Sequence, residues 1–244
     1  MCSACVENSA SGSADLPRRQ FLRFAGATVL SLGVLGRARG AEVDPPPKSQ
    51  NVIGSDAALD RLLQGNRRYV EGVSRRHDFV AERSVLAAGQ NPFAAILGCA
   101  DSRVAPEFAF DVGRGDVFVC RVAGNFADIH SIGSFEYAVA ELGVPMILVL
   151  GHSKCGAAAV KAVKEGISFP GHISHLMDAI RPAVKRAEGE PGDLLENAIR
   201  ENVLLNVAAL KTASPILSDA VQQGKLKVVG GVYSLETGRV TLVG

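Results

Sequence analysis

One apolar run constrains the fold more than any other feature of this sequence. Val144–Leu150 contains no charged or polar side chain, so a strand formed by these residues would be apolar on both faces. Strands of this kind are typical of parallel sheets that are covered by helices on both sides. Similar apolar runs alternate with helical patterns, and we expect strands over 93–97, 117–122 and 226–232 and helices over 131–142, 156–165, 174–187 and 193–211. This alternation predicts an α/β fold with a mostly parallel β-sheet flanked by helices.

The segments on either side of this pattern differ from it. Apolar residues fall near helical spacing over about 56–71, which predicts an amphipathic helix. This helix stands apart from the later core pattern, so we expect an N-terminal helical arm that packs on a neighbouring subunit. At the other end, residues 233–243 predict a closing hairpin with its turn at Thr237 and Gly238.

Residues 1–40 have the pattern of an export signal. Arg18 and Arg19 precede Phe24–Gly36, a run without charged residues. A membrane-spanning helix needs about 20 apolar residues, so this run is too short to span a bilayer and is typical of a signal peptide. The arginine pair resembles the twin-arginine signal, which directs the export of folded proteins. We therefore expect a periplasmic or extracellular protein without a stable membrane span.

The rest of the chain is predicted to form one domain. Three prolines, Pro45–Pro47, favour an extended linker over 41–54, and the folded domain is then expected over 55–244. Apolar residues make up 47% of the chain, which is enough for a packed core. The formal net charge of +1 excludes the strongly basic surface of a dedicated nucleic-acid-binding protein.

Reactive side chains follow two of the predicted strands at the point where each strand ends. Cys99 comes directly after one apolar run, and His152 and Cys155 follow another. Ligands bind beyond the carboxyl ends of the strands in open α/β sheets, so we expect these side chains to meet. Two thiolates and an imidazole suit zinc. A Cys99–Cys155 disulfide is the alternative, because an exported protein meets oxidising conditions.

Four segments carry a resemblance to a known family. In order and spacing, the sequence is similar to the β-class carbonic anhydrases over about residues 56–240, and the matching motifs are Cys99–Arg103, Arg121–Asn125, Glu136–Val139 and Gly151–Gly156. The resemblance implies the parallel-sheet α/β fold of that family and one Zn²⁺ per subunit, held by Cys99, His152 and Cys155. It also implies a homodimer or a higher even-numbered homo-oligomer, in which the N-terminal helix crosses to the partner.

The implied reaction is the reversible hydration of carbon dioxide to bicarbonate and a proton, by a hydroxide formed on zinc. Two thiolates cancel the charge of Zn²⁺, so the site acidifies water less than a site of three histidines does. Asp101 is expected to accept a hydrogen bond from this water while Arg103 holds the carboxylate. In the family, the residue matching Asp101 either pairs with the arginine in an open form or becomes the fourth zinc ligand in a closed form.

A small, nearly apolar substrate requires a tight pocket with few polar contacts. The resemblance places Gln90, Phe118 and Tyr137 in that pocket, some of them across the dimer interface. The backbone N–H of Gly156, at the start of a helix, is expected to face an oxyanion.

Two further functions remain open at the level of sequence. Relatives with this zinc site hydrolyse carbonyl sulfide or carbon disulfide, which makes such a hydrolase the second enzyme hypothesis. A non-catalytic, zinc-stabilised interaction module is the hypothesis from another class. The presence of both Asp101 and Arg103 speaks against that module, because a purely structural zinc site has no need of the pair.

Two histidines and one further cysteine lie outside the matching motifs. His172 and His175 lie near the start of a predicted helix and are candidates for a proton shuttle, because imidazole titrates near neutral pH. Two solvated side chains are the simpler interpretation. Cys120 lies in the middle of a predicted strand, where we expect a small buried hydrophobic residue.

Overall fold

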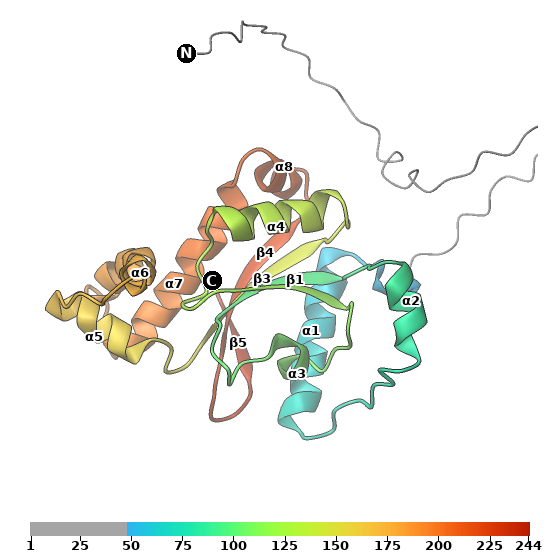
Figure 1. Cartoon of the computed structure of the whole chain (residues 1–244), viewed down its shortest axis with the longest axis horizontal. Helices are drawn as coiled ribbons and strands as arrows, with labels where there is room; N and C mark the ends of the chain where they lie inside the picture. Colours follow the sequence, from blue (N-terminus) through green and yellow to red (C-terminus); the bar gives the residue numbers. More distant parts are fainter. Residues whose placement is uncertain (1–47) are drawn as a thin grey trace, which may run out of the picture. The chain divides into compact units, whose positions relative to one another are not determined.

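The computed structural model describes residues 48–244 (Figure 1). At its centre is a five-stranded sheet in the order β2-β1-β3-β4-β5. The strands are β1 (Ala94–Gly98), β2 (Val117–Arg121), β3 (Met146–His152), β4 (Lys227–Tyr233) and β5 (Val240–Val243). β5 runs antiparallel to β4, and the other neighbouring pairs are parallel. The predicted mostly parallel sheet and its closing hairpin are confirmed.

Helices cover both faces of this sheet (Figure 1). Their bounds are α1 (Ser55–Val70), α2 (Glu82–Ala88), α3 (Pro106–Ala109), α4 (Ile129–Ala140), α5 (Ala157–Glu165), α6 (Ile173–Ala187), α7 (Leu194–Thr212) and α8 (Ile216–Gln222). α1 and α3 pack on one face, and α4, α7 and α8 pack on the other. α5 and α6 pack together beside α7 and share a small apolar cluster with it. The predicted layers of helix, sheet and helix are therefore present.

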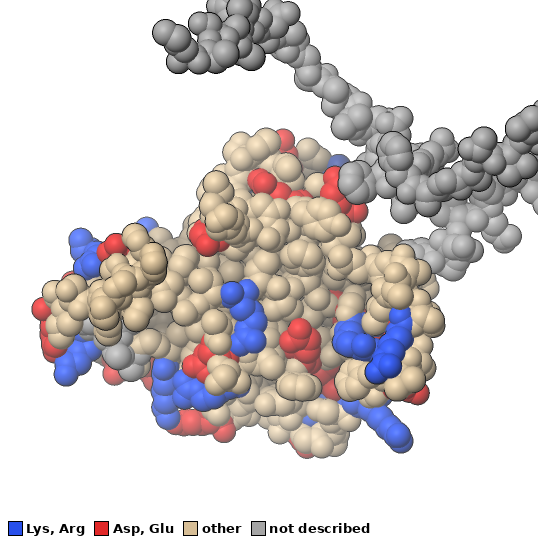
Figure 2. Space-filling view, viewed as in Figure 1, with Lys and Arg blue, Asp and Glu red and all other residues tan. Residues whose placement is uncertain are grey.

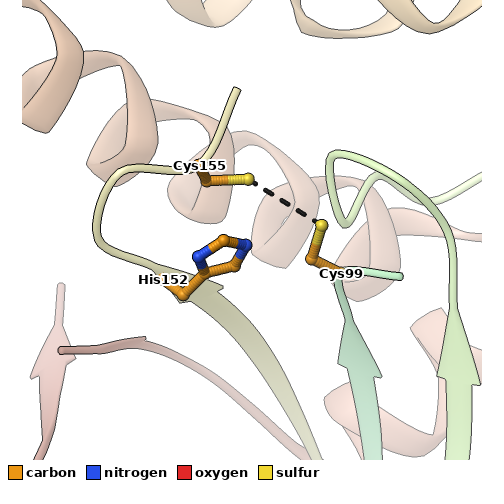
Figure 3. A group of neighbouring side chains, drawn as sticks. All are labelled: Cys99, His152 and Cys155. Carbon is orange, nitrogen blue, oxygen red and sulfur yellow. Dashed lines mark hydrogen bonds between the residues drawn. The ribbon is translucent and has the colours of Figure 1, made fainter. Parts of the chain in front are cut away.

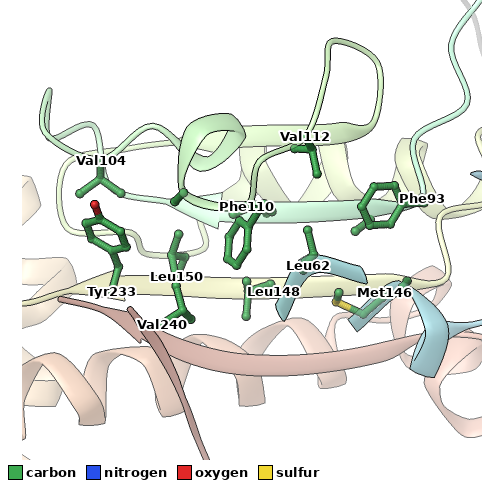
Figure 4. Packing of buried hydrophobic residues seen from close by; sticks show 14 residues of the cluster. Leu62, Phe93, Val104, Phe110, Val112, Met146, Leu148, Leu150, Tyr233 and Val240 are labelled. Atoms are coloured by element: carbon green, nitrogen blue, oxygen red, sulfur yellow. The ribbon is translucent and has the colours of Figure 1, made fainter. Parts of the chain in front are cut away.

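The central strands send alternate side chains into two separate cores. β3 directs Met146, Leu148 and Leu150 to the face that α1 covers. Ile147 and Val149 point to the opposite face, where α4 and α7 pack. Figure 4 shows the first of these cores, with the three β3 side chains in a row across it. An uninterrupted apolar run is the sequence that such a doubly covered strand requires.

The amphipathic helix α1 packs on its own sheet. Ala58 and Leu62 are fully buried in the core of Figure 4. Asn66 Nδ2 donates hydrogen bonds to the carbonyl oxygens of Ala109 at 2.9 Å and Gly238 at 2.8 Å, which ties the helix to α3 and to the β4–β5 turn. The expectation that this helix stands apart from the core is thereby corrected, because its apolar face covers β3 within the same chain.

Residues 48–54 fall inside the predicted linker, and in the structure they pack on the domain. Ser49–Asn51 form a short 3₁₀ helix. Asp116 is the anchor for this segment, because it accepts hydrogen bonds from Lys48 Nζ at 3.0 Å and from Asn51 Nδ2 at 3.1 Å. Burial opposes the ionisation of Asp116, but these hydrogen bonds outweigh it and lower the pKa of the carboxyl group.

The predicted export signal, residues 1–40, and the first part of the linker, residues 41–47, lie outside the described residues. Within residues 48–244, no helix is both long enough and apolar enough to cross a lipid bilayer. On the face shown in Figure 2, basic and acidic side chains lie in small groups of both signs between large uncharged areas.

Candidate metal centre

Two neighbouring strands bring three potential metal ligands together. β1 and β3 run parallel, with Gly98 at the end of β1 opposite Leu150. Cys99 follows β1 directly, His152 ends β3, and Cys155 lies in the turn before α5 (Figure 3). The ligand atoms of these three residues all lie within 4.8 Å of one another. The structure therefore brings together the three side chains that the sequence predicts as zinc ligands.

The imidazole of His152 is oriented so that one of its nitrogen atoms is left free. Nδ1 lies 3.0 Å from the carbonyl oxygen of Ser153, which can only accept, so Nδ1 carries the proton. Nε2 is buried and has no hydrogen-bond partner among the described residues. A buried nitrogen without a partner is costly in a protein interior, but a metal ion would use its lone pair. This tautomer fits ligation through Nε2.

The two thiol groups complete the donor set. Cys99 Sγ and Cys155 Sγ are 3.8 Å apart, and the backbone N–H of Gly124 donates to Cys99 Sγ at 3.4 Å. The hydrogen bond from Cys155 lowers the pKa of Cys99 to about 3, and the same contact raises the pKa of Cys155. A divalent cation resolves this competition, because it deprotonates both thiols. Cys99, Cys120 and Cys155 are free cysteines, so the alternative of a Cys99–Cys155 disulfide is not the arrangement found.

Asp101 and Arg103 form a bidentate pair beside the three ligands. Arg103 Nε donates to Asp101 Oδ1 at 2.9 Å, and Arg103 Nη2 donates to Asp101 Oδ2 at 2.7 Å. These hydrogen bonds hold the pKa of the Asp101 carboxyl far below its usual range, so the carboxylate stays ionised. Asp101 Oδ2 also lies 3.7 Å from His152 Nε2. The carboxylate is thus held next to the point where the ligand atoms converge.

Arg121 has a role that the sequence reasoning did not assign. It ends β2 next to the loop that follows β1, and its guanidinium crosses to that loop. Nε donates to the carbonyl oxygen of Cys99 at 2.8 Å, and Nη2 donates to the carbonyl oxygen of Asp101 at 2.7 Å. The arginine therefore fixes the backbone that carries one ligand and the carboxylate. Its place in the Arg121–Asn125 motif was the available signal.

A cavity of about 350 Å³ opens beside these residues. Cys99, Asp101 and Cys155 line part of it, and Gly156 also lies in its wall. Much of the remaining wall is aliphatic and is formed by Val160, Leu176, Met177, Ile180, Val184 and Ile199. Such a cavity suits a small molecule with little polarity.

The other three predicted pocket residues lie elsewhere in the single chain. Gln90 precedes β1 and lies near the amino end of that strand, whereas Cys99 follows its carboxyl end. Phe118 lies on β2, and its ring centroid is 6.5 Å from that of Tyr137 on α4. Gln90, Phe118 and Tyr137 do not line the cavity within one chain. Their role in binding the substrate stays a prediction.

The histidine pair proposed as a proton shuttle lies at the amino end of α6. The ring centroids of His172 and His175 are 6.2 Å apart, and both side chains are exposed. Neither residue lines the cavity. Their role in proton transfer stays a prediction.

Three convergent ligands with a carboxylate and an apolar cavity beside them are typical of a metal-dependent α/β enzyme, because the protein closes a structural metal site with four ligands of its own. Residues 94–240 match the family model described as carbonic anhydrase. The chain therefore belongs to the carbonic anhydrase family, in its β class, and is an enzyme of that family.

Similar proteins extend this match over most of the chain. The sequence is 41% identical over 189 residues to carbonic anhydrase 2 of Mycobacterium tuberculosis, covering 76% of this chain and 91% of the relative. It is 36% identical over 189 residues to a carbonic anhydrase of Mycolicibacterium smegmatis, covering 76% and 92%. Among solved structures, a Coccomyxa β-carbonic anhydrase in complex with acetazolamide is 32% identical, with a TM-score of 0.58 over 75% of this chain and 85% of that chain.

Proposed function

We propose that the protein catalyses the reversible hydration of carbon dioxide to bicarbonate and a proton, with one Zn²⁺ per subunit. The observation that carries this proposal is the bidentate Asp101–Arg103 pair, which lies next to the Cys99–His152–Cys155 ligand set at an apolar cavity. A structural zinc site needs neither the pair nor the cavity. An enzyme that adds water to a small apolar molecule can use the carboxylate to orient the water and the cavity to hold the substrate.

The chain's own residues account for binding the metal. Cys99, Cys155 and His152 Nε2 would hold Zn²⁺, since two thiolates and a neutral imidazole are donors that zinc prefers. When bound, Zn²⁺ supplies a Lewis acid that makes water a nucleophile near neutral pH. The Ser153 carbonyl oxygen fixes the imidazole tautomer, and the Gly124 N–H stabilises the Cys99 thiolate.

Asp101 directs the proton of the attacking water. Its carboxylate is ionised and accepts hydrogen bonds, and Arg103 fixes both oxygen atoms in one plane. The separation of 3.7 Å between Asp101 Oδ2 and His152 Nε2 puts the carboxylate within reach of the ligand cluster. Without Arg103, the carboxylate would be free to ligate the metal and block it, as in the closed form of the family.

The cavity favours the uncharged substrate. Its aliphatic wall from α6 and α7 offers dispersion contacts to carbon dioxide and few hydrogen bonds to competing water. Gly156 lies in the wall directly before α5, so its backbone N–H is available to an oxygen atom of bicarbonate.

A homodimer would complete this pocket. β2 is an edge strand of the sheet, and its residues are half-buried or exposed in the single chain. Phe118 on this strand and Tyr137 on α4, whose side chain is 50% exposed, lie together on that edge. A second copy that packs on this edge would receive Phe118, Tyr137 and Gln90 at its own metal centre.

Catalysis is proposed to take place outside the cytoplasm. The support is the sequence of residues 1–40, in which Arg18 and Arg19 precede an uncharged apolar run. A protein that carries its metal before export would leave the cell with Cys99 and Cys155 already occupied and protected from oxidation.

The test of the reaction combines metal analysis with stopped-flow hydration assays on the purified protein. The wild type should contain one zinc per chain and should hydrate carbon dioxide. Cys155→Ser should lose both zinc and activity, while Cys120→Ser, which removes a thiol outside the ligand set, should keep both. Parallel assays with carbonyl sulfide and carbon disulfide distinguish the hydrolase alternative. If the protein contains zinc but turns over none of the three substrates, the result would favour the non-catalytic interaction module.

A further inference from the structure

Asn125 has an unused hydrogen-bond donor at the cavity. The residue lies in the loop after β2, is 2% exposed, and lines the same cavity as Cys99 and Asp101. Its carboxamide nitrogen Nδ2 is buried and has no hydrogen-bond partner among residues 48–244. Buried polar groups in folded proteins are nearly always paired, so an orphaned donor requires an explanation. A bound metal ion would explain the orphaned Nε2 of His152, because it would use the lone pair of that nitrogen. It cannot explain Asn125 Nδ2, because a cation does not accept a hydrogen bond.

The backbone holds Asn125 in a strained conformation. Its φ angle is 41°, in the left-handed region that few residues other than glycine and asparagine adopt. Its N–H donates to the carbonyl oxygen of Val122 at 2.9 Å, which closes a tight turn. Strained backbone that the surrounding structure enforces is found at binding sites, where it fixes a side chain in place.

The turn is anchored on two sides. Asn202 Nδ2 from α7 donates to the carbonyl oxygen of Gly124 at 2.8 Å. The N–H of the same glycine donates to Cys99 Sγ at 3.4 Å. The carboxamide of Asn125 is therefore positioned relative to a metal ligand through one residue of backbone, and it has little freedom to move away.

The chemistry of the cavity limits what this donor can bind. An acceptor is required, and much of the wall around it is aliphatic. Asp101 is the charged residue in the described wall, and it accepts no hydrogen bond from Asn125. Because none of the wall residues accepts from Asn125 Nδ2, the donor is available to a bound ligand, and a negatively charged oxygen atom is a stronger acceptor than a neutral one.

We propose that Asn125 is a substrate-binding residue whose Nδ2 donates a hydrogen bond to an oxygen atom of bicarbonate in the cavity. This inference rests on the proposed function, since it takes bicarbonate as the oxyanion. The donor is fixed before the ligand arrives, so no side chain has to be ordered when bicarbonate binds.

The test measures how tightly nitrate binds to the zinc-loaded wild type, to two variants of Asn125 and to one control variant, by calorimetric titration. Nitrate is an oxyanion that has a shape similar to that of bicarbonate and does not react. Asn125→Gly tolerates the left-handed backbone and removes the donor, so nitrate should bind about 10- to 100-fold more weakly. Asn125→Asp keeps the shape and replaces the donor with a charged acceptor, so binding should weaken further. The KM for bicarbonate should rise in the same order, with a smaller change in kcat.

The control is Asn206→Asp in the same loop–helix network. Asn206 Oδ1 accepts from the N–H of Ala127 at 2.7 Å, and its Nδ2 donates to Asn202, but the residue does not line the cavity. This variant should lower the melting temperature and leave the nitrate affinity unchanged. If Asn125 had only a structural role, Asn125→Gly would also lower the melting temperature and leave the nitrate affinity unchanged.

A second readout observes the donor directly. In ¹⁵N-labelled protein, the side-chain NH₂ signal that disappears in Asn125→Gly should shift when nitrate is added to the wild type. An unshifted signal, or wild-type nitrate affinity in Asn125→Gly, overturns the inference while zinc binding and hydration stay intact. A wild-type protein that binds zinc and nitrate but does not hydrate carbon dioxide overturns the proposed function instead.

Discussion

Arg121 shows how one side chain organises the centre without touching the metal ligands' side chains. Its two hydrogen bonds go to the carbonyl oxygens of Cys99 and Asp101, so it fixes the backbone that leads from β1 into the site. Arg103 then fixes the carboxylate itself. Arg121 therefore fixes the main chain at Asp101, and Arg103 fixes its side chain.

Asp101→Asn should lower kcat for carbon dioxide hydration by about 10²- to 10⁴-fold, the usual contribution of a group that handles a proton. The amide cannot carry the charge that pairs with Arg103, and one of the two acceptor oxygen atoms becomes a donor, while the zinc ligands are untouched. Stopped-flow hydration assays and zinc analysis measure both effects. The matched control is Glu236→Gln, which removes an exposed carboxylate that pairs with Lys154. Near-normal hydration by Asp101→Asn at neutral pH would contradict the role given to this carboxylate.

At the scale of the elements, α7 packs so closely on the sheet that two strand positions have no room for a Cβ atom. A Cβ atom at Gly230 of β4 would lie 2.6 Å from Val203 Cγ1, and one at Gly151 of β3 would lie 2.7 Å from Val203 Cγ2. Two neighbouring strands therefore carry glycine where the helix crosses them. This close approach also brings Asn202, the residue before Val203, to the loop that holds Asn125.

Gly230→Ala should lower the free energy of unfolding by about 1–3 kcal/mol, because the methyl group has to displace Val203 in a packed core. Gly133→Ala is the matched control, since a Cβ atom there meets nothing within 4 Å on helix α4. It should raise the free energy of unfolding by about 0.5–1 kcal/mol through the backbone entropy of glycine. Urea denaturation of the two variants measures both changes, and equal effects would refute the close packing of α7.

The segment before α1 is expected to contribute stability that depends on pH. Lys48→Met removes a hydrogen bond to the buried Asp116 carboxylate and should cost about 1.5–3 kcal/mol at pH 7. The folded pKa of Asp116 is lowered, so the contribution is complete above the unfolded pKa of about 3.9 and is lost as pH falls through the folded pKa. The difference from wild type should therefore shrink below about pH 4.

The control for this prediction is Lys161→Met, which breaks an exposed pair with Glu165 at 3.9 Å on helix α5. Exposed pairs of this kind contribute little, so urea denaturation should show a small change at every pH. A loss of stability in Lys48→Met that stays constant from pH 7 to pH 3 would show that Asp116 is not the partner that matters.

The sequence predicted the strands and the ligand cluster because each rests on a local pattern. β3 is apolar on both faces, and Cys99 and His152 stand where two strands end. The helices α2, α3 and α8 were not predicted, since each has seven residues or fewer and no repeating apolar face can develop. Arg121 and Asn125 were not assigned roles, because contacts with backbone and strained φ angles leave no periodic signal.

At the scale of the whole molecule, the proposed homodimer would divide the substrate pocket between two copies of the chain. Phe118→Ala/Tyr137→Ala and Asp101→Asn should each be nearly inactive alone and should restore activity when coexpressed. In mixed dimers, the intact metal centre of one subunit receives the intact aromatic residues of the other, so about one site in four is complete. Stopped-flow assays of the coexpressed pair measure the recovery.

The control for this complementation is coexpression of Asp101→Asn with Arg103→Ala. Both variants damage the same metal centre, so no mixed dimer contains an intact one and activity should stay low. Recovery in this control, or no recovery in the test pair, would refute a pocket shared between subunits.

Export is expected to depend on the arginine pair. Arg18→Lys/Arg19→Lys keeps the charge of residues 1–40 but removes the twin-arginine pattern, so the precursor should accumulate inside the cell. Its activity in lysate should be close to that of the wild type. Arg23→Lys is the control in the same segment and should be exported normally. Cell fractionation measures the outcome, and normal export of the double variant would indicate an ordinary secretory route.

The position of the ligands along the chain has a topological consequence. Cys99 and Cys155 are 56 residues apart, and a metal that joins them closes the intervening polypeptide into a ring that contains β2, α4 and β3. Closing a ring of this size lowers the conformational entropy of the unfolded chain, which raises its free energy by about 4 kcal/mol in the usual treatment. To pass through a pore, such a ring would have to enter with two lengths of polypeptide side by side. A precursor that carried its metal could therefore not be threaded through a pore as a single extended chain.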